Sequence, residues 1–123
     1  MLASLYTNLL SIVFGFFLTP SEFYINIENT AKGIELRCEK GCNWTSLEVI
    51  DGRKWTFISD LKSCYSKDSD NCNYEAFLFS IRKSSGTIFL KGQHNTHWID
   101  LSFTLRKGDV QLINNSGMIA PKP

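Results

Sequence analysis

The chain has 123 residues, a length typical of one domain, and its charge is almost balanced, with 13 Lys and Arg against 12 Asp and Glu. The basic residues are scattered without a stripe or run, which argues against nucleic acid as a partner. Apart from the closing APKP, residues 120–123, no segment has the composition of a disordered or low-complexity region.

The first 21 residues contain no charged side chain, and Leu9–Leu18 is a largely apolar run of ten residues. This run is too short to cross a hydrocarbon core of about 30 Å as a helix, and it fits the apolar region of a secretory signal. Thr19 and Ser21 are small residues in front of a cut before Glu22. We therefore predict a signal peptide over 1–21 and a secreted or periplasmic protein. Because no Lys or Arg precedes the run, a buried apolar segment and an N-terminal membrane anchor are the alternatives.

From Glu22 onward the hydrophobic periodicity is two, which indicates strands. Phe23, Ile25 and Ile27 alternate with other side chains, and clusters of Gly, Asn, Asp and Lys interrupt the pattern. The first strands are predicted near 22–28, 33–38, 44–50 and 54–59. A Ser-, Asp- and Asn-rich loop over 60–75 follows, and then strands near 76–82, 87–92, 98–105 and 109–114.

Residues 23–49 and 77–103 carry the same pattern 54 residues apart, with six identities in 27 aligned positions. Average composition gives about one or two identities by chance. The identical pairs are Phe23/Phe77, Ile27/Ile81, Ile34/Ile88, Leu36/Leu90, Trp44/Trp98 and Leu47/Leu101. We interpret this as an internal duplication, with repeats over 22–59 and 76–114 in a single β domain, 22–123. In the fourth strand the similarity requires a slip of one residue.

This duplication predicts an all-β fold: an antiparallel sandwich or small barrel of about eight strands from two four-strand units. Two meanders are expected to pack together, because neither can easily bury its apolar face alone. A tryptophan kept in both units serves what the units share, so Trp44 and Trp98 are predicted core residues rather than ligand platforms. Gly41 and its counterpart Asn95 are predicted to adopt a left-handed backbone at a turn.

Four cysteines follow the apolar segment: Cys38, Cys42, Cys64 and Cys72. An even count in a short exported chain indicates two disulfides. Zinc is the alternative, but zinc sites usually have short spacings in both pairs, and the second pair has seven residues between its cysteines. Cys38 and Cys42 align with Gly92 and Thr96, so both thiols are missing together from the second unit. We therefore predict the pairs Cys38–Cys42 and Cys64–Cys72, the second closing the linker loop, with cross-pairing as the alternative.

The segment HNTHWID, 94–100, is chemically the most suggestive part of the chain. His94, His97 and Asp100 place two imidazoles and a carboxylate within seven residues, a set that zinc or another transition metal can use. The helical H-E-x-x-H arrangement is absent, so two exposed loop histidines are the alternative and no metal is assigned. The first unit has other polar residues at the matching positions, and we therefore predict that this tip contributes to recognition.

The sequence gives less support to calcium binding, nucleophilic catalysis or phosphate binding. Asp68 and Asp70 in the linker offer oxygens to calcium, but the loop lacks the EF-hand spacing and is predicted to be solvated. No serine stands in a G-x-S-x-G context, no phosphate-binding glycine loop occurs, and oxidised cysteines are not nucleophiles. No catalytic residue and no cofactor is predicted.

The sequence therefore favours a small exported β domain that binds another protein through loops on a disulfide-stapled scaffold. An inhibitor of a secreted or periplasmic enzyme is one concrete form. The alternatives are a metal-dependent hydrolase using His94, His97 and Asp100, and a structural surface component. Neither nucleic acid nor a stable membrane span is expected.

Overall fold

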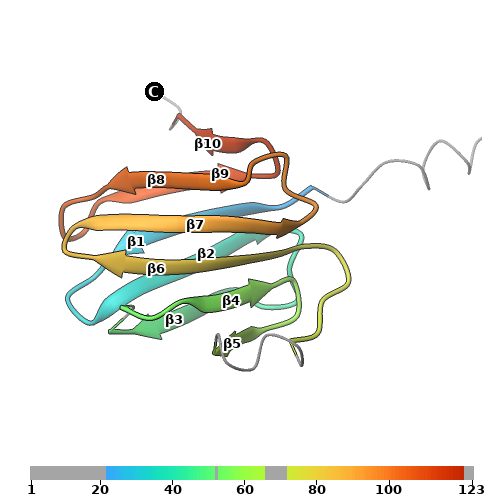
Figure 1. Cartoon of the computed structure of the whole chain (residues 1–123), viewed down its shortest axis with the longest axis horizontal. Coiled ribbons are helices and arrows are strands. Elements are labelled where there is room, and N and C mark those ends of the chain that lie inside the picture. The colour runs from blue at the N-terminus through green and yellow to red at the C-terminus, as the bar shows by residue number, and fades with distance from the viewer. Residues whose placement is uncertain (1–21, 52, 66–71, 121–123) are drawn as a thin grey trace, which may run out of the picture.

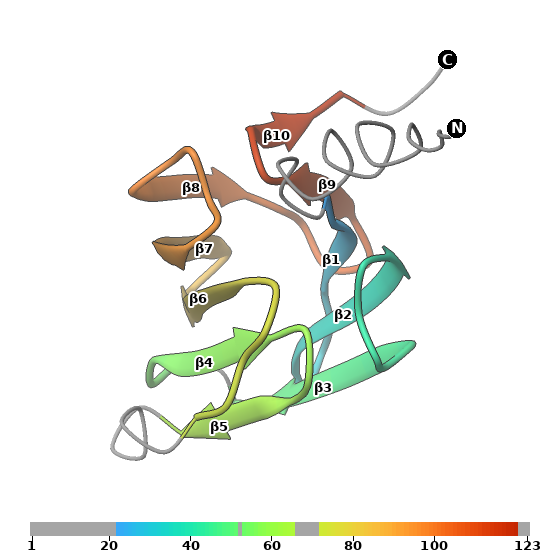
Figure 2. The same cartoon turned by 90° about the vertical axis from the view of Figure 1, so that its right-hand side faces the viewer.

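The computed structural model describes residues 22–51, 53–65 and 72–120. Within these residues all regular structure is β, in two five-stranded antiparallel sheets that pack on one another (Figure 1; Figure 2). The predicted all-β fold is therefore confirmed, and of the two predicted architectures, an antiparallel sandwich or a small barrel, the structure has the sandwich. The predicted signal peptide, 1–21, lies outside the described residues.

Sheet 1 contains, in spatial order, β10 (Gly117–Ile119), β9 (Val110–Asn114), β1 (Tyr24–Asn29), β2 (Gly33–Lys40) and β3 (Ser46–Ile50). Sheet 2 contains β5 (Ser63–Tyr65), β4 (Thr56–Ser59), β6 (Leu78–Ser84), β7 (Thr87–His94) and β8 (Asp100–Thr104). The described residues thus form ten strands rather than about eight. The two additional strands, β5 and β10, have three residues each, which is too short for the alternation that reveals a strand in sequence.

The connection between the halves differs from two separate meanders. After three strands of sheet 1, the chain crosses, and β4 and β5 extend sheet 2 beside β6. After three strands of sheet 2, it crosses back, and β9 and β10 extend sheet 1 beside β1. Each half therefore completes the sheet of the other, and Figure 2 shows the two layers that result.

The pairing registers of the two crossing strands are equivalent. Ile58 of β4 pairs with Phe79 of β6, and Ile113 of β9 pairs with Ile25 of β1. The β1 and β6 positions lie 54 residues apart, whereas the crossing-strand positions lie 55 apart. The one-residue slip inferred from sequence is therefore present, and it places a fully buried isoleucine at the same point of both sheets.

A single apolar core lies between the sheets. Phe23 and Phe77, the aligned first aromatic residues of the two halves, are both 1% exposed, and their ring centres lie 4.3 Å apart. The fully buried Phe79 lies beside them, with 5.8 Å between its ring centre and that of Phe77. Fully burying such a side chain contributes about 1.5–3 kcal/mol, so the aromatic cluster is a main source of stability.

Both predicted disulfides are present, Cys38–Cys42 and Cys64–Cys72, and no described cysteine is free. The zinc alternative is therefore excluded for these thiols. Two disulfides in a short chain are typical of an oxidising, extracytoplasmic compartment. The turn that follows Cys38 also has the predicted backbone, since Gly41 and its counterpart Asn95 have φ values of 91° and 59°.

Candidate functional site

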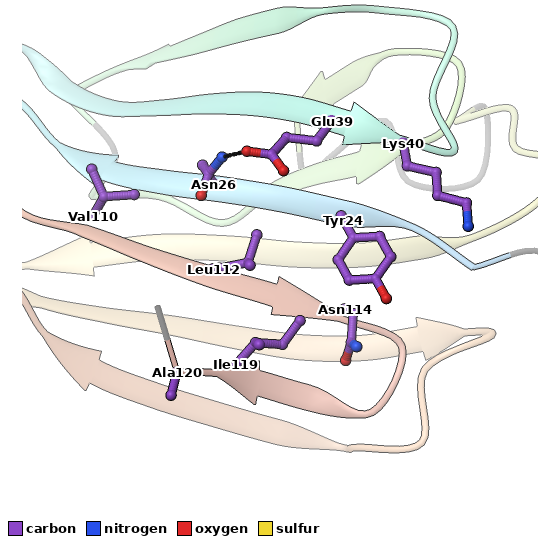
Figure 3. A pocket seen from close by; sticks show the side chains of 9 residues that line it. All are labelled: Tyr24, Asn26, Glu39, Lys40, Val110, Leu112, Asn114, Ile119 and Ala120. Carbon is purple, nitrogen blue, oxygen red and sulfur yellow. Dashed lines mark hydrogen bonds between the residues drawn. The ribbon is translucent and has the colours of Figure 1, made fainter. Parts of the chain in front are cut away.

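A groove of about 780 Å³ lies on the outer face of sheet 1 (Figure 3). Its lining combines apolar, aromatic and amide side chains with one acid and one base: Tyr24, Asn26, Glu39, Lys40, Val110, Leu112, Asn114, Ile119 and Ala120. In Figure 3, Tyr24 and Asn114 lie toward one end and Val110 toward the other, with Leu112 between them.

The groove follows from strand alternation. Along β1, Ile25 and Ile27 are fully buried in the core, so Tyr24 and Asn26 lie on the outer face. Along β9, the buried Ile113 likewise leaves its neighbours on the outer face. The edge strand β10 completes the apolar floor, because its last residue pairs directly with Leu112 of β9.

Polar contacts order the end of the groove near Tyr24. Lys40 Nζ lies 5.7 Å from the centre of the Tyr24 ring and 3.8 Å from the Glu22 carboxylate. Asn114 Oδ1 accepts hydrogen bonds from the backbone amides of Ser116, at 2.8 Å, and Gly117, at 3.1 Å. Asn26 donates to Glu39 on the neighbouring strand. The groove thus has an apolar middle and a polar rim, the usual arrangement of a recognition surface.

The matching surface of sheet 2 is covered by the chain itself, by the segment 72–75. By pairing register, Ile119 of sheet 1 corresponds to Cys64, which forms the disulfide with Cys72. Asn114 corresponds to Ser59, whose Oγ donates to the carbonyl oxygen of Asn73 at 2.8 Å. Cys72 is only 6% exposed.

The same segment also contacts the position that matches Lys40. Lys40 corresponds to His94, whose ring lies 4.9 Å from that of Tyr74. The segment therefore touches three of the positions that correspond to the groove lining. No described residue covers the groove of sheet 1 in this way.

A buried carboxylate anchors the covering segment. Asp60 is 4% exposed, and its Oδ1 accepts hydrogen bonds from the backbone amides of Glu75, Ala76 and Phe77 at 3.0, 2.8 and 3.2 Å. Burial desolvates this carboxylate and would raise its pKa, but the hydrogen bonds to the three amides outweigh burial and hold the pKa below the ordinary value of 3.8. The carboxylate thus stays charged and fixes where β6 begins.

The residues predicted from HNTHWID lie in different surroundings. Both histidines are exposed; His94 ends β7 with its ring near that of Tyr74, whereas His97 lies beyond the strand and its backbone amide donates to the Asn115 carbonyl at 2.8 Å. Asp100 begins β8 on the outer face of sheet 2, opposite Lys91. Within the part of the chain that the structure describes, no group of three His, Cys, Asp or Glu residues could hold a metal ion, so His94, His97 and Asp100 do not converge.

The structure also shows where the two tryptophans that were predicted as core residues lie. Trp98 belongs to the core and is 8% exposed, while Trp44 is partly buried and packs against the core. Their indole N–H groups donate to corresponding carbonyls, those of Asn114 at 3.0 Å and Ser59 at 2.8 Å. Both tryptophans therefore brace the end of a crossing strand. The linker acids Asp68 and Asp70 lie outside the described residues.

Sequence reasoning missed the groove, because its walls come from strands far apart in the chain. One signal was available: in VQLIN, 110–114, apolar residues occupy both alternating sets, so that one set must face outward.

Comparisons with family models, curated proteins and solved structures found no match to the chain. Among the residues that the structure describes, no helix is long and apolar enough to cross a membrane.

Proposed function

We propose that this protein is an exported binding module whose groove on sheet 1 takes an extended segment of another protein. The observation that carries the proposal is the covered surface of sheet 2. There, at matching positions, the bound object is a short stretch of polypeptide outside the strands, the segment 72–75. A surface of the same design on sheet 1 suits an occupant of the same kind.

The covering segment also suggests the chemistry of the partner. Cys72 is bonded to Cys64, the counterpart of Ile119, so an apolar side chain at the same place would contact Ile119 in the groove. The aromatic ring of Tyr74 lies against His94, where Lys40 in the groove offers a cation to an aromatic ring. We therefore expect an apolar residue followed two positions later by an aromatic residue. A secreted or periplasmic enzyme that is inhibited through such a segment is one form of partner.

A synthetic peptide tests this function directly. The probe is Asn-Leu-Asn-Tyr-Glu-Ala, the chain's own 71–76 with leucine in place of Cys72. We expect binding in the range of about 0.1–1 mM, since so short a ligand contributes few contacts against its ordering cost. Nuclear magnetic resonance titration should shift the backbone signals of Tyr24, Leu112 and Ile119.

Matched variants locate the binding. Leu112→Glu places a charge on the groove floor and should abolish the shifts, at about 1 kcal/mol or less in stability because the residue lies on the outer face. Met118→Glu is the control, since Met118 is 51% exposed on the same edge strand and does not line the groove. Absence of binding, or binding that survives Leu112→Glu, would contradict the proposal.

A further inference from the structure

A second hollow, of about 460 Å³, lies on the outer face of sheet 2 and combines cations with aromatic rings. The guanidinium carbon of Arg82 lies 5.3 Å from the centre of the Trp55 ring and 4.8 Å from that of Phe89. Lys91 Nζ lies 5.1 Å from the centre of the Trp55 ring. Asp100 and Ser102 of the edge strand β8 complete its polar lining.

The corresponding positions of sheet 1 show what is unusual about this hollow. Glu28, Glu35 and Arg37 stand there in place of Arg82, Phe89 and Lys91. Arg37 Nη2 lies 2.9 Å from Glu28 Oε1 and 3.0 Å from Glu35 Oε1, so that cluster neutralises its own cation.

In sheet 2 both acids of that cluster are replaced. One position carries a second cation, Arg82, and the other carries the aromatic residue Phe89. Neither Arg82 nor Lys91 forms an ion pair with a carboxylate among the described residues. Two cations held against one aromatic ring repel each other, and a bound anion would relieve that repulsion.

The side chains also suggest the shape of the anion. The guanidinium of Arg82 is planar, and two of its N–H donors can bind the two oxygens of one carboxylate at the same time. The Trp55 ring, partly exposed, offers an apolar surface. Asp100 repels a ligand that carries only negative charge, but its carboxylate accepts hydrogen bonds from hydroxyl groups.

We propose that this hollow binds an acidic sugar, a uronate unit of a glycan. The sugar carboxylate would pair with Arg82 and Lys91, C–H groups of the sugar ring would contact the exposed part of Trp55, and ring hydroxyls would donate to Asp100. An acidic peptide can donate its backbone N–H groups to Asp100, but it has no ring of C–H groups for Trp55 and fits less well. This site lies on the other sheet from the groove and does not depend on the function proposed for it.

The test uses isothermal titration of the protein with a galacturonate tetramer, the neutral galactose tetramer and tetraglutamate as three separate ligands. We expect the galacturonate tetramer to bind at least about tenfold more tightly than either of the others, which is about 1.4 kcal/mol. Binding should weaken as salt increases, because screening reduces the attraction between the carboxylate and the two cations. Equal binding of the neutral sugar, or equal binding of tetraglutamate, would overturn the assignment.

Variants tie the binding to the hollow. Arg82→Gln should lower the affinity at least about fivefold, whereas Arg106→Gln removes an exposed guanidinium elsewhere and should leave it unchanged. The double change Arg82→Glu with Phe89→Glu gives sheet 2 the acids of sheet 1, which already surround a cation there. It should abolish binding and leave the unfolding temperature nearly unaltered. Full affinity in either Arg82 variant would overturn the proposal.

Discussion

Asp60 and Asn115 occupy the same place in the two halves of the molecule, and they differ by a single functional group. Asp60 Oδ1 accepts from the amide of Phe77, and Asn115 Oδ1 accepts from the amide of Phe23 at 2.8 Å. Asn115 also donates its Nδ2 to the Asn95 carbonyl at 2.9 Å. A charge from the first half thus anchors the first strand of the second half, and a neutral amide from the second half anchors the first strand of the first half.

This difference predicts how stability depends on pH. The pKa of Asp60 is lower in the folded state than its ordinary value of 3.8, so its contribution is complete above about pH 4. That contribution is lost as the pH falls through the lowered folded pKa. Asp60→Asn should cost about 1–3 kcal/mol at pH 7, because hydrogen bonds to a charged acceptor are stronger.

Urea unfolding between pH 7 and pH 2 measures this effect. The stabilities of the Asp60→Asn variant and the parent protein should approach each other as the pH falls. The reverse change, Asn115→Asp, removes the donor to Asn95 and should destabilise the protein at neutral pH. Parallel pH profiles for Asp60→Asn and the parent would show that the carboxylate charge is not the anchor.

Trp98 and Trp44 form a second matched pair. Trp98→Ala should cost about 3–5 kcal/mol because the side chain is almost fully buried, and Trp44→Ala should cost less because Trp44 is only partly buried. Replacing either with Phe removes the N–H donor and retains most of the ring, so each should cost about 1–3 kcal/mol. Thermal unfolding of the four variants checks this order, and a reversed order for the alanine variants would contradict it.

At the scale of the element, the turn after β2 is closed by a disulfide, while the corresponding turn after β7 is closed by a hydrogen bond from a threonine that lies close to a glycine. Thr96 Oγ1 donates to the Trp98 carbonyl at 3.0 Å, and a side chain at Gly92 would collide with Thr96 and with that carbonyl. The glycine and the threonine are therefore a matched pair that replaces the two cysteines. This explains why both thiols are missing together from the second half.

The substitution of one closure for the other can be tested. Cys38→Gly with Cys42→Thr gives the first turn the residues of the second, and we expect a loss of about 2 kcal/mol or less. A short closed loop restricts the unfolded chain only weakly, and the threonine offers a replacement hydrogen bond. Denaturant unfolding measures the loss. Cys38→Ala with Cys42→Ala is the control and should be less stable than the Gly/Thr variant; the opposite order would show that the two turns are not interchangeable.

The strands and the disulfide pairs could be predicted from sequence because both depend on local spacing and on the 54-residue offset. The crossing of β4 could not. Ile58 would be buried in the same core whether β4 belonged to sheet 1 or to sheet 2. The alternation of residues between the two faces of β4 is therefore the same for a meander and for a crossing. Trp55 comes close to Arg82 only because β4 lies beside β6, and the cation–aromatic hollow was therefore hidden from sequence.

At the scale of the whole molecule, the crossing makes the two halves interdependent. Sheet 1 consists of β1, β2 and β3 from the first half and β9 and β10 from the second, and sheet 2 is divided in the reciprocal way. Lys83 adds a polar link between the sheets, because its Nζ donates to Asn29 Oδ1 at 2.8 Å and to the Gly33 carbonyl at 3.0 Å. Separating the halves would break both sheets as well as the core between them.

We therefore expect that neither fragment, 22–60 or 75–123, folds alone, and that the two together regain the sandwich. Each isolated fragment would leave an apolar sheet face and an unpaired strand edge in water. β4 in the first fragment, and β9 and β10 in the second, would have no sheet to extend. Circular dichroism should show disordered fragments, and an equimolar mixture should gain β signal with a transition temperature that rises with concentration.

The parent protein, in which the halves are linked, should show no such dependence of the transition temperature on concentration. A cooperative transition in either fragment at low concentration would mean that half of the sandwich is a complete unit. A transition in the first fragment alone that appears only at high concentration would mean that a second copy can take the place of the other half, as the matched registers of the two halves allow.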